Sequence, residues 1–141
     1  MLSHISNKIT PRGWEIVKVG DFIEKPSITK NKLPNKNYQE KGKLPVIDQG
    51  SKFIGGYTDR TDMKVNCNLP VIIFGDHTKV IKYIDFDYVA GADGIKVIKP
   101  IGYYEKLFYY FLHALQLPDK GYARHFQFLE KLLIPLPPLN E

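Results

Sequence analysis

The sequence is poor in cysteine: its 141 residues hold a single one, Cys67. One thiol can neither close an internal disulfide nor begin a zinc ribbon, so redox and zinc-finger proteins are excluded. No apolar run approaches the roughly 20 residues that a membrane span needs, and the first eight residues lack the apolar stretch of a signal peptide. We therefore expect a cytoplasmic protein without a membrane partner.

The sequence lacks the motifs of two classes of enzyme, the nucleotide-binding enzymes and the methyltransferases. The glycine segment 91–94 is followed at 95–98 by residues typical of a strand, whereas a phosphate-binding loop leads into a helix. A methyltransferase would need a nucleotide-type fold and a catalytic tetrapeptide of the NPPY kind, and the sequence shows neither. The chain therefore carries no sign of nucleotide binding or methyl transfer.

What the sequence does contain is an ordinary globular composition, with 43% hydrophobic and 25% charged residues. These values lie far from those of disordered chains, and the length fits one domain. We predict a single domain over residues 1–141.

The excess of positive charge is confined to one segment. The formal net charge is +5, and residues 25–43 contain six lysines and one acid, so this segment accounts for the whole excess. It has two prolines, three asparagines and no sustained apolar period, which predicts a long surface loop. Lysines of this kind can neutralise phosphates of a nucleic acid, although a mobile loop kept soluble by lysine is an equally simple interpretation.

Apolar spacing predicts an α/β (α+β) fold: a mixed, mainly antiparallel sheet with one main helix and long loops. We expect a short helix over 14–23, strands over 44–47, 52–57, 69–74, 79–86 and 95–99, and the main helix over 103–117 before Pro118. The strand over 69–74 is nearly all apolar, as in strands buried on both faces. Residues 121–126 read as a loop, followed by a last apolar segment and a proline-rich extended exit.

Catalytic interpretations rest on weak patterns. Asp48 with Asp62 and Lys64 loosely follows the arrangement in which two carboxylates hold magnesium and a lysine steadies the attacking water. Cys67 with His77 could serve nucleophilic catalysis, but no third member is evident. An ordinary thiol and chance spacing of aspartates are the simpler explanations, and we prefer them for both patterns.

Six segments, taken in order, resemble the target recognition domain of the specificity subunit of Type I restriction-modification enzymes. They are PRGWE at 11–15, PVIDQGS at 45–51, GYT at 56–58, FGDHT at 74–78, DGIKV at 93–97 and IPLPPLNE at 134–141. The resemblance spans almost the whole chain, although no single segment is specific.

The resemblance implies a fold similar to the DNA-recognition domain of adenine methyltransferases and a non-enzymatic role: binding double-stranded DNA and reading one half of a two-part target. It places methylation, ATP hydrolysis and cleavage in methyltransferase and motor-nuclease partner subunits, which would hold S-adenosylmethionine, ATP and magnesium; this chain would hold no cofactor and no metal. Residues 134–141 would begin the connector towards a spacer helix. Because the chain stops at Glu141, we expect a single recognition domain without that helix.

Charge and resemblance together give two sets of candidate DNA-binding residues. Phosphate contacts are expected from Lys30, Lys32, Lys36, Lys41, Lys43, Arg60, Lys79 and Lys82. Base edges in the major groove would be read by Gln49, Ser51, Tyr57, His77, Arg124 and His125.

Two alternatives stay open. Arg124 could instead form an ion pair with Asp119 or Glu130. The chain could also be a protein-interaction module that docks a methyltransferase or nuclease subunit without binding DNA, through the helix side that carries Tyr103, Tyr109, Tyr110 and His113 together with the proline-rich tail.

Overall fold

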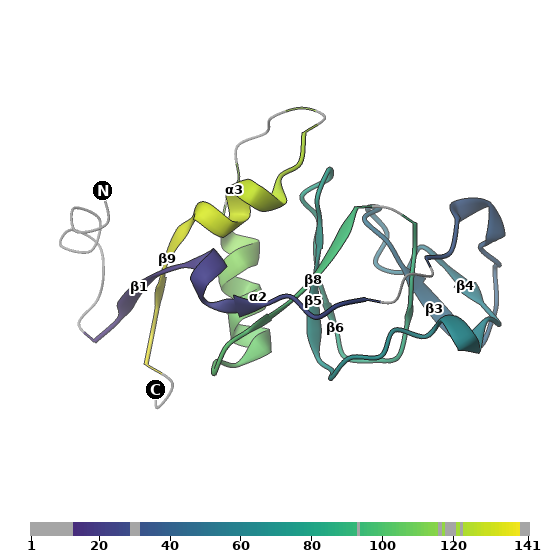
Figure 1. Cartoon of the computed structure of the whole chain (residues 1–141), viewed down its shortest axis with the longest axis horizontal. Coiled ribbons are helices and arrows are strands. Elements are labelled where there is room, and N and C mark those ends of the chain that lie inside the picture. Colours follow the sequence, from purple (N-terminus) through teal and green to yellow (C-terminus); the bar gives the residue numbers. More distant parts are fainter. Residues whose placement is uncertain are drawn as a thin grey trace.

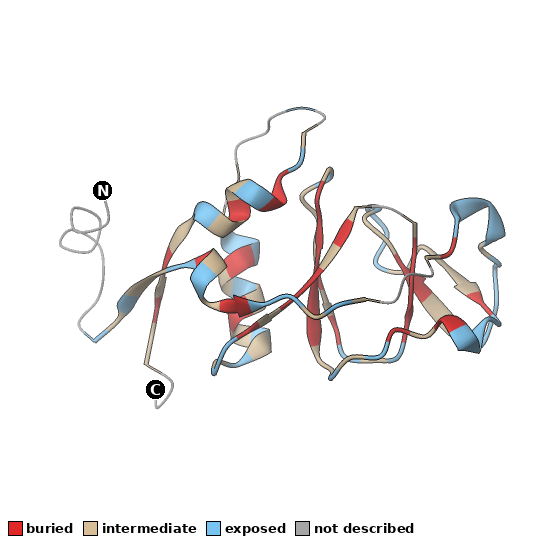
Figure 2. Ribbon diagram, in the orientation of Figure 1, coloured by how far each residue is buried: buried red, intermediate tan, exposed pale blue. Residues whose placement is uncertain are grey.

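The central strand of the structure is β5 (Val71–Gly75), and all five of its residues are buried (Figure 2). The computed structural model describes residues 13–28, 32–92, 94–115, 117, 121 and 123–138. β5 pairs antiparallel with β6 (Ile81–Ile84) on one side and with β8 (Ile95–Pro100) on the other. β2 (Ile23–Glu24) completes this four-stranded sheet beside β8. The strands predicted within 69–74, 79–86 and 95–99 are therefore confirmed.

A second sheet has three strands and mixed direction. β3 (Leu44–Ile47) pairs antiparallel with β4 (Gly56–Thr58) and parallel with β7 (Val89–Ala90). The strand predicted over 44–47 is confirmed. The prediction over 52–57 is wrong for most of its length, because only its last two residues belong to β4.

The described part of the lysine-rich segment contains no strand after β2, in keeping with the predicted loop. It includes a 3-10 turn, η2 (Asn35–Asn37), and its Leu33 is buried in the core. Another 3-10 turn, η3 (Thr61–Met63), follows β4.

The short helix predicted over 14–23 is wrong. Residues there form β1 (Glu15–Lys18), a 3-10 turn η1 (Val19–Asp21) and β2. β1 pairs antiparallel with β9 (Leu133–Leu136), so its backbone groups find partners more than a hundred residues away along the chain. Residues 134–136 of the expected connector belong to β9, and residues 139–141 lie outside the described part.

The main predicted helix is present as α2 (Glu105–Ala114). Its buried residues, Phe108 and Leu112, are four positions apart and share one face. A second helix, α3 (Phe126–Lys131), occupies the last apolar segment together with β9. None of the described helices is long and apolar enough to cross a membrane.

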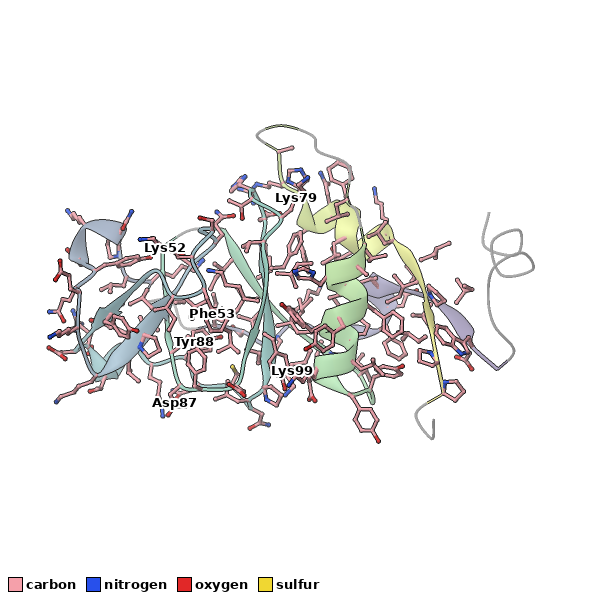
Figure 3. All side chains as sticks on the ribbon, turned by 180° about the vertical axis from the view of Figure 1, so that it is seen from behind. Lys52, Phe53, Lys79, Asp87, Tyr88 and Lys99 are labelled. Atoms are coloured by element: carbon pink, nitrogen blue, oxygen red, sulfur yellow. The ribbon has the colours of Figure 1, made fainter. Side chains whose placement is uncertain are left out.

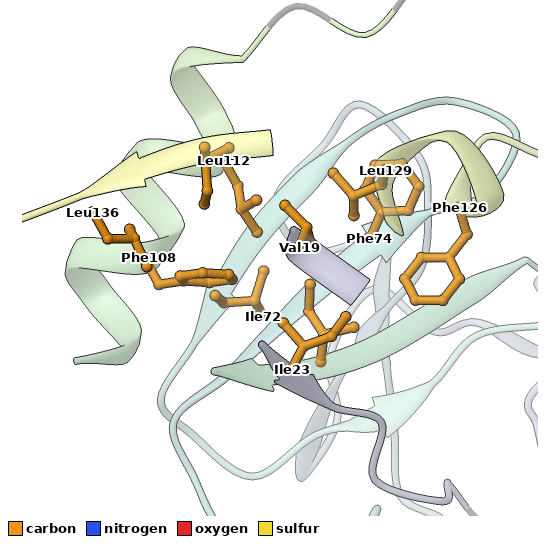
Figure 4. Packing of buried hydrophobic residues seen from close by; sticks show 11 residues of the cluster. Val19, Ile23, Ile72, Phe74, Phe108, Leu112, Phe126, Leu129 and Leu136 are labelled. Atoms are coloured by element: carbon orange, nitrogen blue, oxygen red, sulfur yellow. The ribbon is translucent and has the colours of Figure 1, made fainter. Parts of the chain in front are cut away.

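Alternation along β5 joins two hydrophobic cores. Ile72 and Phe74 pack with α2, α3, η1 and β9, as Figure 4 shows. Val71 and Ile73 point to the opposite face and pack with β3, β7 and the residues near them. Along the molecule, β1, β9 and the helices therefore lie at one end, the four-stranded sheet in the middle, and β3 and β4 at the other end (Figure 1).

Candidate nucleic-acid interface

Gln49 connects the loop after β3 to the turn between β5 and β6. Its Oε1 accepts hydrogen bonds from the backbone N–H groups of His77, at 2.9 Å, and Thr78, at 3.3 Å. Its own carbonyl oxygen accepts a hydrogen bond from Thr78 Oγ1 at 2.7 Å. These bonds fix the end of the β5–β6 hairpin against the three-stranded sheet.

Two glycines make room for this contact. A Cβ at Gly75 would overlap Thr78 Oγ1 and the Gln49 Cβ, and a Cβ at Gly94 would overlap the Gln49 side-chain amide. Gly94 also has φ +82°, a conformation that side chains disfavour. Three segments quoted for the family resemblance, around positions 49, 75–78 and 94, thus meet at one point although they are distant in sequence.

Asp76 joins the same turn to the start of α3. Its Oδ1 accepts the backbone N–H of Phe126 at 2.8 Å, and its carbonyl oxygen accepts the N–H of His125 at 2.6 Å. His77 Nδ1 lies 3.2 Å from the carbonyl oxygen of Ala123. Because a carbonyl oxygen only accepts, this His77 nitrogen carries the proton. Arg124 is therefore held between two anchored neighbours.

These contacts create an open cleft, which we call the β5–β6 cleft. Lys32, Lys96 and Arg124 bring three cationic side chains to it, beside the residues of the hairpin turn. Its lining consists of Lys32, Gln49, Asp76, His77, Thr78, Gly94, Ile95, Lys96 and Arg124. The cleft therefore combines positive charge with polar groups able to read a hydrogen-bonding surface.

A second groove continues the β5–β6 cleft along β8. The two share Lys32, Ile95 and Lys96, and the groove adds Lys25 and Phe126 to the lining. The ammonium groups of Lys25 and Lys96 lie 5.8 and 5.9 Å from the centre of the Phe126 ring. Glu130 also lines this groove and pairs with Lys25 at 2.9 Å, so Lys32 and Lys96 supply the remaining positive charge there.

The structure brings together four of the predicted DNA-binding residues: Lys32, Gln49, His77 and Arg124. Within the described residues Arg124 forms no ion pair, and Glu130 binds Lys25 at 2.9 Å instead. Asp119, the other predicted partner, lies outside the described part of the chain.

Other predicted phosphate-binding residues lie elsewhere. Lys36, Lys41 and Lys43 are exposed near η2 and β3, at the end of the molecule opposite β1 and β9 (Figure 1). Lys79 lies near the end of the β5–β6 hairpin (Figure 3), with its Nζ 3.5 Å from the carbonyl oxygen of Leu117. Lys30 falls outside the described residues.

Arg60 is exposed but already paired. Its guanidinium donates two hydrogen bonds to the Asp62 carboxylate, at 2.9 and 2.8 Å. This bidentate contact lowers the pKa of Asp62 and raises the pKa of Arg60. A phosphate at Arg60 would have to compete with that carboxylate.

Two predicted contacts are wrong because the side chains are buried. Lys82 is 3% exposed, and its ammonium group donates hydrogen bonds to the carbonyl oxygens of Asp48 and Lys52, both at 2.7 Å. Burial lowers the pKa of Lys82, and the Asp48 carboxylate partly opposes that change. His125 is 0% exposed, with Nδ1 3.1 Å from the Asp76 carbonyl oxygen. Lys82 cannot reach a phosphate, and His125 cannot reach a base edge.

The remaining candidates do not line the β5–β6 cleft. Ser51 is exposed in the loop before β4. Tyr57 lines a separate shallow surface hollow with Tyr38, Gln39 and Lys52. Sequence reasoning missed Lys96 and Asp76; the alternation of Lys96 with the apolar Ile95 and Val97 is the signal that could have placed Lys96 on the opposite face of the strand.

The residues of the two catalytic patterns, among them Asp48, Asp62 and Cys67, make contacts that differ from those catalysis would require. Asp48 Oδ2 accepts a hydrogen bond from Tyr38 at 2.9 Å, whereas Asp62 binds Arg60. Cys67 packs against the core that contains Val71 and Ile73. In the part of the chain that the structure describes, no three His, Cys, Asp or Glu side chains gather as metal ligands would.

Comparison with known sequences gives two findings. The family model for the Type I restriction modification DNA specificity domain matches residues 11–141. The specificity subunit of the Type I restriction enzyme EcoR124I/EcoR124II from Escherichia coli is 33% identical over 85 residues, which are 60% of this chain and 21% of that subunit.

Solved structures share the fold. The HsdS subunit from Thermoanaerobacter tengcongensis is 21% identical, with a TM-score of 0.56, over 94% of this chain and 35% of that one. The S subunit of a Type I restriction-modification system from M. genitalium is 18% identical, with a TM-score of 0.61, over 92% and 35%. The predicted α+β class, with mixed and mainly antiparallel sheets, is confirmed. The chain spans about a third of the length of these two proteins.

Proposed function

Because the chain belongs to the Type I restriction modification DNA specificity domain family, we propose that it binds double-stranded DNA and reads one half of a two-part target. The observation that carries this proposal is the convergence of Lys32, Lys96 and Arg124 on the polar end of the β5–β6 hairpin. Such a surface fits duplex DNA, whose phosphates carry negative charge and whose base edges in the groove carry hydrogen-bonding groups.

Only the turn between β5 and β6 is available for base reading, because β5 itself is the buried central strand of the four-stranded sheet. This turn lies next to the loop that carries Arg124, so side chains of the two segments could reach base edges in the major groove together. We place His77 and Arg124 against base edges. Gln49 holds the turn, and Ser51 and Tyr57 would contact bases only beyond the cleft.

Phosphate contacts would flank this centre. Lys32 and Lys96 line the β5–β6 cleft, and Lys36, Lys41 and Lys43 are exposed farther along the molecule. Arg60 would have to release Asp62, and Lys79 the Leu117 carbonyl oxygen, before either contacts a phosphate, and Lys30 stays a predicted contact. Phosphate contacts set the register of a protein on the duplex, whereas contacts to base edges select the sequence.

Chemistry would belong to partner subunits. As a specificity module in the cytoplasm, the chain would direct a methyltransferase and a motor-nuclease subunit to DNA, and those subunits would hold S-adenosylmethionine, ATP and magnesium. The exposed Tyr104 and Tyr110 of the α2 region offer a surface for such partners, because tyrosine is enriched at protein interfaces.

Fluorescence anisotropy with a labelled random-sequence duplex tests DNA binding directly. If about five lysines contact phosphates, the logarithm of the affinity should fall against the logarithm of salt concentration with a slope of roughly −4 to −5. A double substitution of Lys18 and Lys106 by alanine is the control for substitutions in the cleft. Both residues are exposed and neither lines the cleft, so this variant should keep the slope of the unmodified protein. A slope near zero for the unmodified protein would contradict the proposal.

A further inference from the structure

Lys82 is a buried cation with an unusual set of partners. Its side chain comes from β6, is 3% exposed, and bonds to two carbonyl oxygens at the two ends of the segment 48–52. The Asp48 Oδ1 atom lies 3.8 Å from the same ammonium group. One side chain therefore fastens both ends of the loop that carries Gln49.

The side chain of Asp48 makes two further hydrogen bonds at the same loop. Its Oδ1 accepts the backbone N–H of Gly50 at 2.9 Å, and its Oδ2 accepts the hydroxyl of Tyr38 at 2.9 Å. Lys82, Asp48 and Tyr38 thus form one partly buried polar network around residues 48–52. The network ends one residue from Gln49, which holds the β5–β6 turn.

The lysine does more than fill space beside the apolar core. Removing an ammonium group from water is costly, although a buried ion pair replaced as a whole by apolar side chains of similar volume often loses no stability. A methionine at position 82 alone would leave the Asp48 and Lys52 carbonyl oxygens and the Asp48 carboxylate without their cation. The ammonium group therefore acts on the path of the loop, because it holds both ends of segment 48–52.

We propose that Lys82 is a positioning residue: it fixes the 48–52 loop so that Gln49 holds the hairpin turn in the geometry that reads DNA. The inference rests on the proposed function for its effect on DNA, while its effect on the loop can be measured without DNA.

Amide hydrogen exchange of the free full-length chain, compared between the unmodified protein and Lys82→Met, tests the loop. The amides of Gly50 and His77 report on it, because they donate to Asp48 Oδ1 and Gln49 Oε1. We expect both to exchange about tenfold faster or more in the variant, the factor that follows from losing hydrogen bonds to a charged group. The amides of β5 should keep their rates. Unchanged rates at Gly50 and His77 would overturn the proposal.

The second arm measures selectivity. A duplex selected by the unmodified protein from a random library competes with a scrambled duplex of the same length. Lys82→Met should lower the preference for the selected duplex about tenfold and leave affinity for the scrambled duplex unchanged, because Lys82 itself does not reach DNA. Retained preference would overturn the positioning role.

Two further outcomes have a defined meaning. If Lys82→Met does not fold, Lys82→Gln replaces it: the glutamine amide is uncharged and its nitrogen lies one bond nearer the backbone, so it cannot hold both carbonyl oxygens as the ammonium group does, and the same exchange increase at Gly50 and His77 is required of it. If the unmodified protein binds no duplex, the proposed function fails, and the exchange measurement still decides whether Lys82 fixes the loop.

Discussion

The carboxylate of Asp76 accepts the backbone N–H of Phe126 at 2.8 Å, across fifty positions of sequence. This bond ties the end of β5 to the first residue of α3, and both groups are buried. The intervening Arg124 loop therefore takes its position from the central sheet.

Asp76→Ala should lower the free energy of unfolding by about 1–3 kcal/mol, because it leaves the Phe126 N–H buried without its acceptor. Urea unfolding measures the change. Asp87→Ala is the matched control: Asp87 is exposed and lies 3.9 Å from Lys64, an arrangement that contributes about 0–1 kcal/mol. Equal losses in the two variants would show that the Asp76 bond has no special weight.

Arg124→Ala should weaken discrimination at one base pair of the target by about 1–3 kcal/mol, since a guanidinium can bind guanine with two hydrogen bonds. Competition between the selected duplex and its single-base variants measures this. Arg124→Lys keeps the charge but loses the planar pair of donors, so it should restore affinity without restoring selectivity. If Arg124→Ala lowers affinity for every duplex equally, Arg124 contacts phosphate instead.

Replacing Lys32 and Lys96 together by alanine should weaken selected and random duplexes alike. Each phosphate contact adds about one to the salt slope, so the slope should become shallower by about two. The Lys18 and Lys106 double variant carries the same charge change away from the cleft and should keep the original slope. An unchanged slope in the Lys32 and Lys96 variant would place the DNA elsewhere on the molecule.

Tyr88→Phe should stabilise the fold by about 1 kcal/mol, because the Tyr88 hydroxyl is buried and has no nitrogen or oxygen partner among the described residues. Tyr88 lies between the sheets (Figure 3). Thermal or urea unfolding at pH 7 checks the sign. A loss of stability would mean that the contact with the neighbouring Cys67 is worth more than the burial costs.

Tyr88→Phe should also change how the stability of the fold falls at alkaline pH. Burial, and then the neighbouring Cys67, raise the pKa of Tyr88 above its ordinary value near 10. Above about pH 10 the unfolded chain loses this proton while the folded chain keeps it, so stability falls as pH rises. Tyr88→Phe should reduce the slope of that fall between pH 10 and 11. Identical slopes would contradict the shift.

Local sequence patterns correctly predicted the helix and strands whose residues are buried in an apolar run or at regular apolar spacing. β5 was recognisable from an apolar run, and α2 from the spacing of Phe108 and Leu112. The family resemblance was confirmed by the match over residues 11–141. In contrast, Glu15–Lys18 is a strand because β9 supplies its partner, and no local spacing reveals a contact of that range.

The candidate site likewise combines residues that the sequence could predict with residues whose position depends on distant contacts. Charge and residue type pointed to Lys32, His77 and Arg124, which the structure brings to one cleft. Lys82 and His125 have the same chemistry, yet their positions in the fold turn them inward. A sequence gives the chemical capacity of a side chain, whereas burial depends on the packing of distant segments and could not be predicted from the residues alone.

The alternation along β5 has one more consequence. Ile72 and Phe74 complete one core while Val71 and Ile73 complete the other, so neither half retains its interior once this strand detaches. Heat should therefore melt the helical end and the three-stranded end together, in one cooperative calorimetric transition.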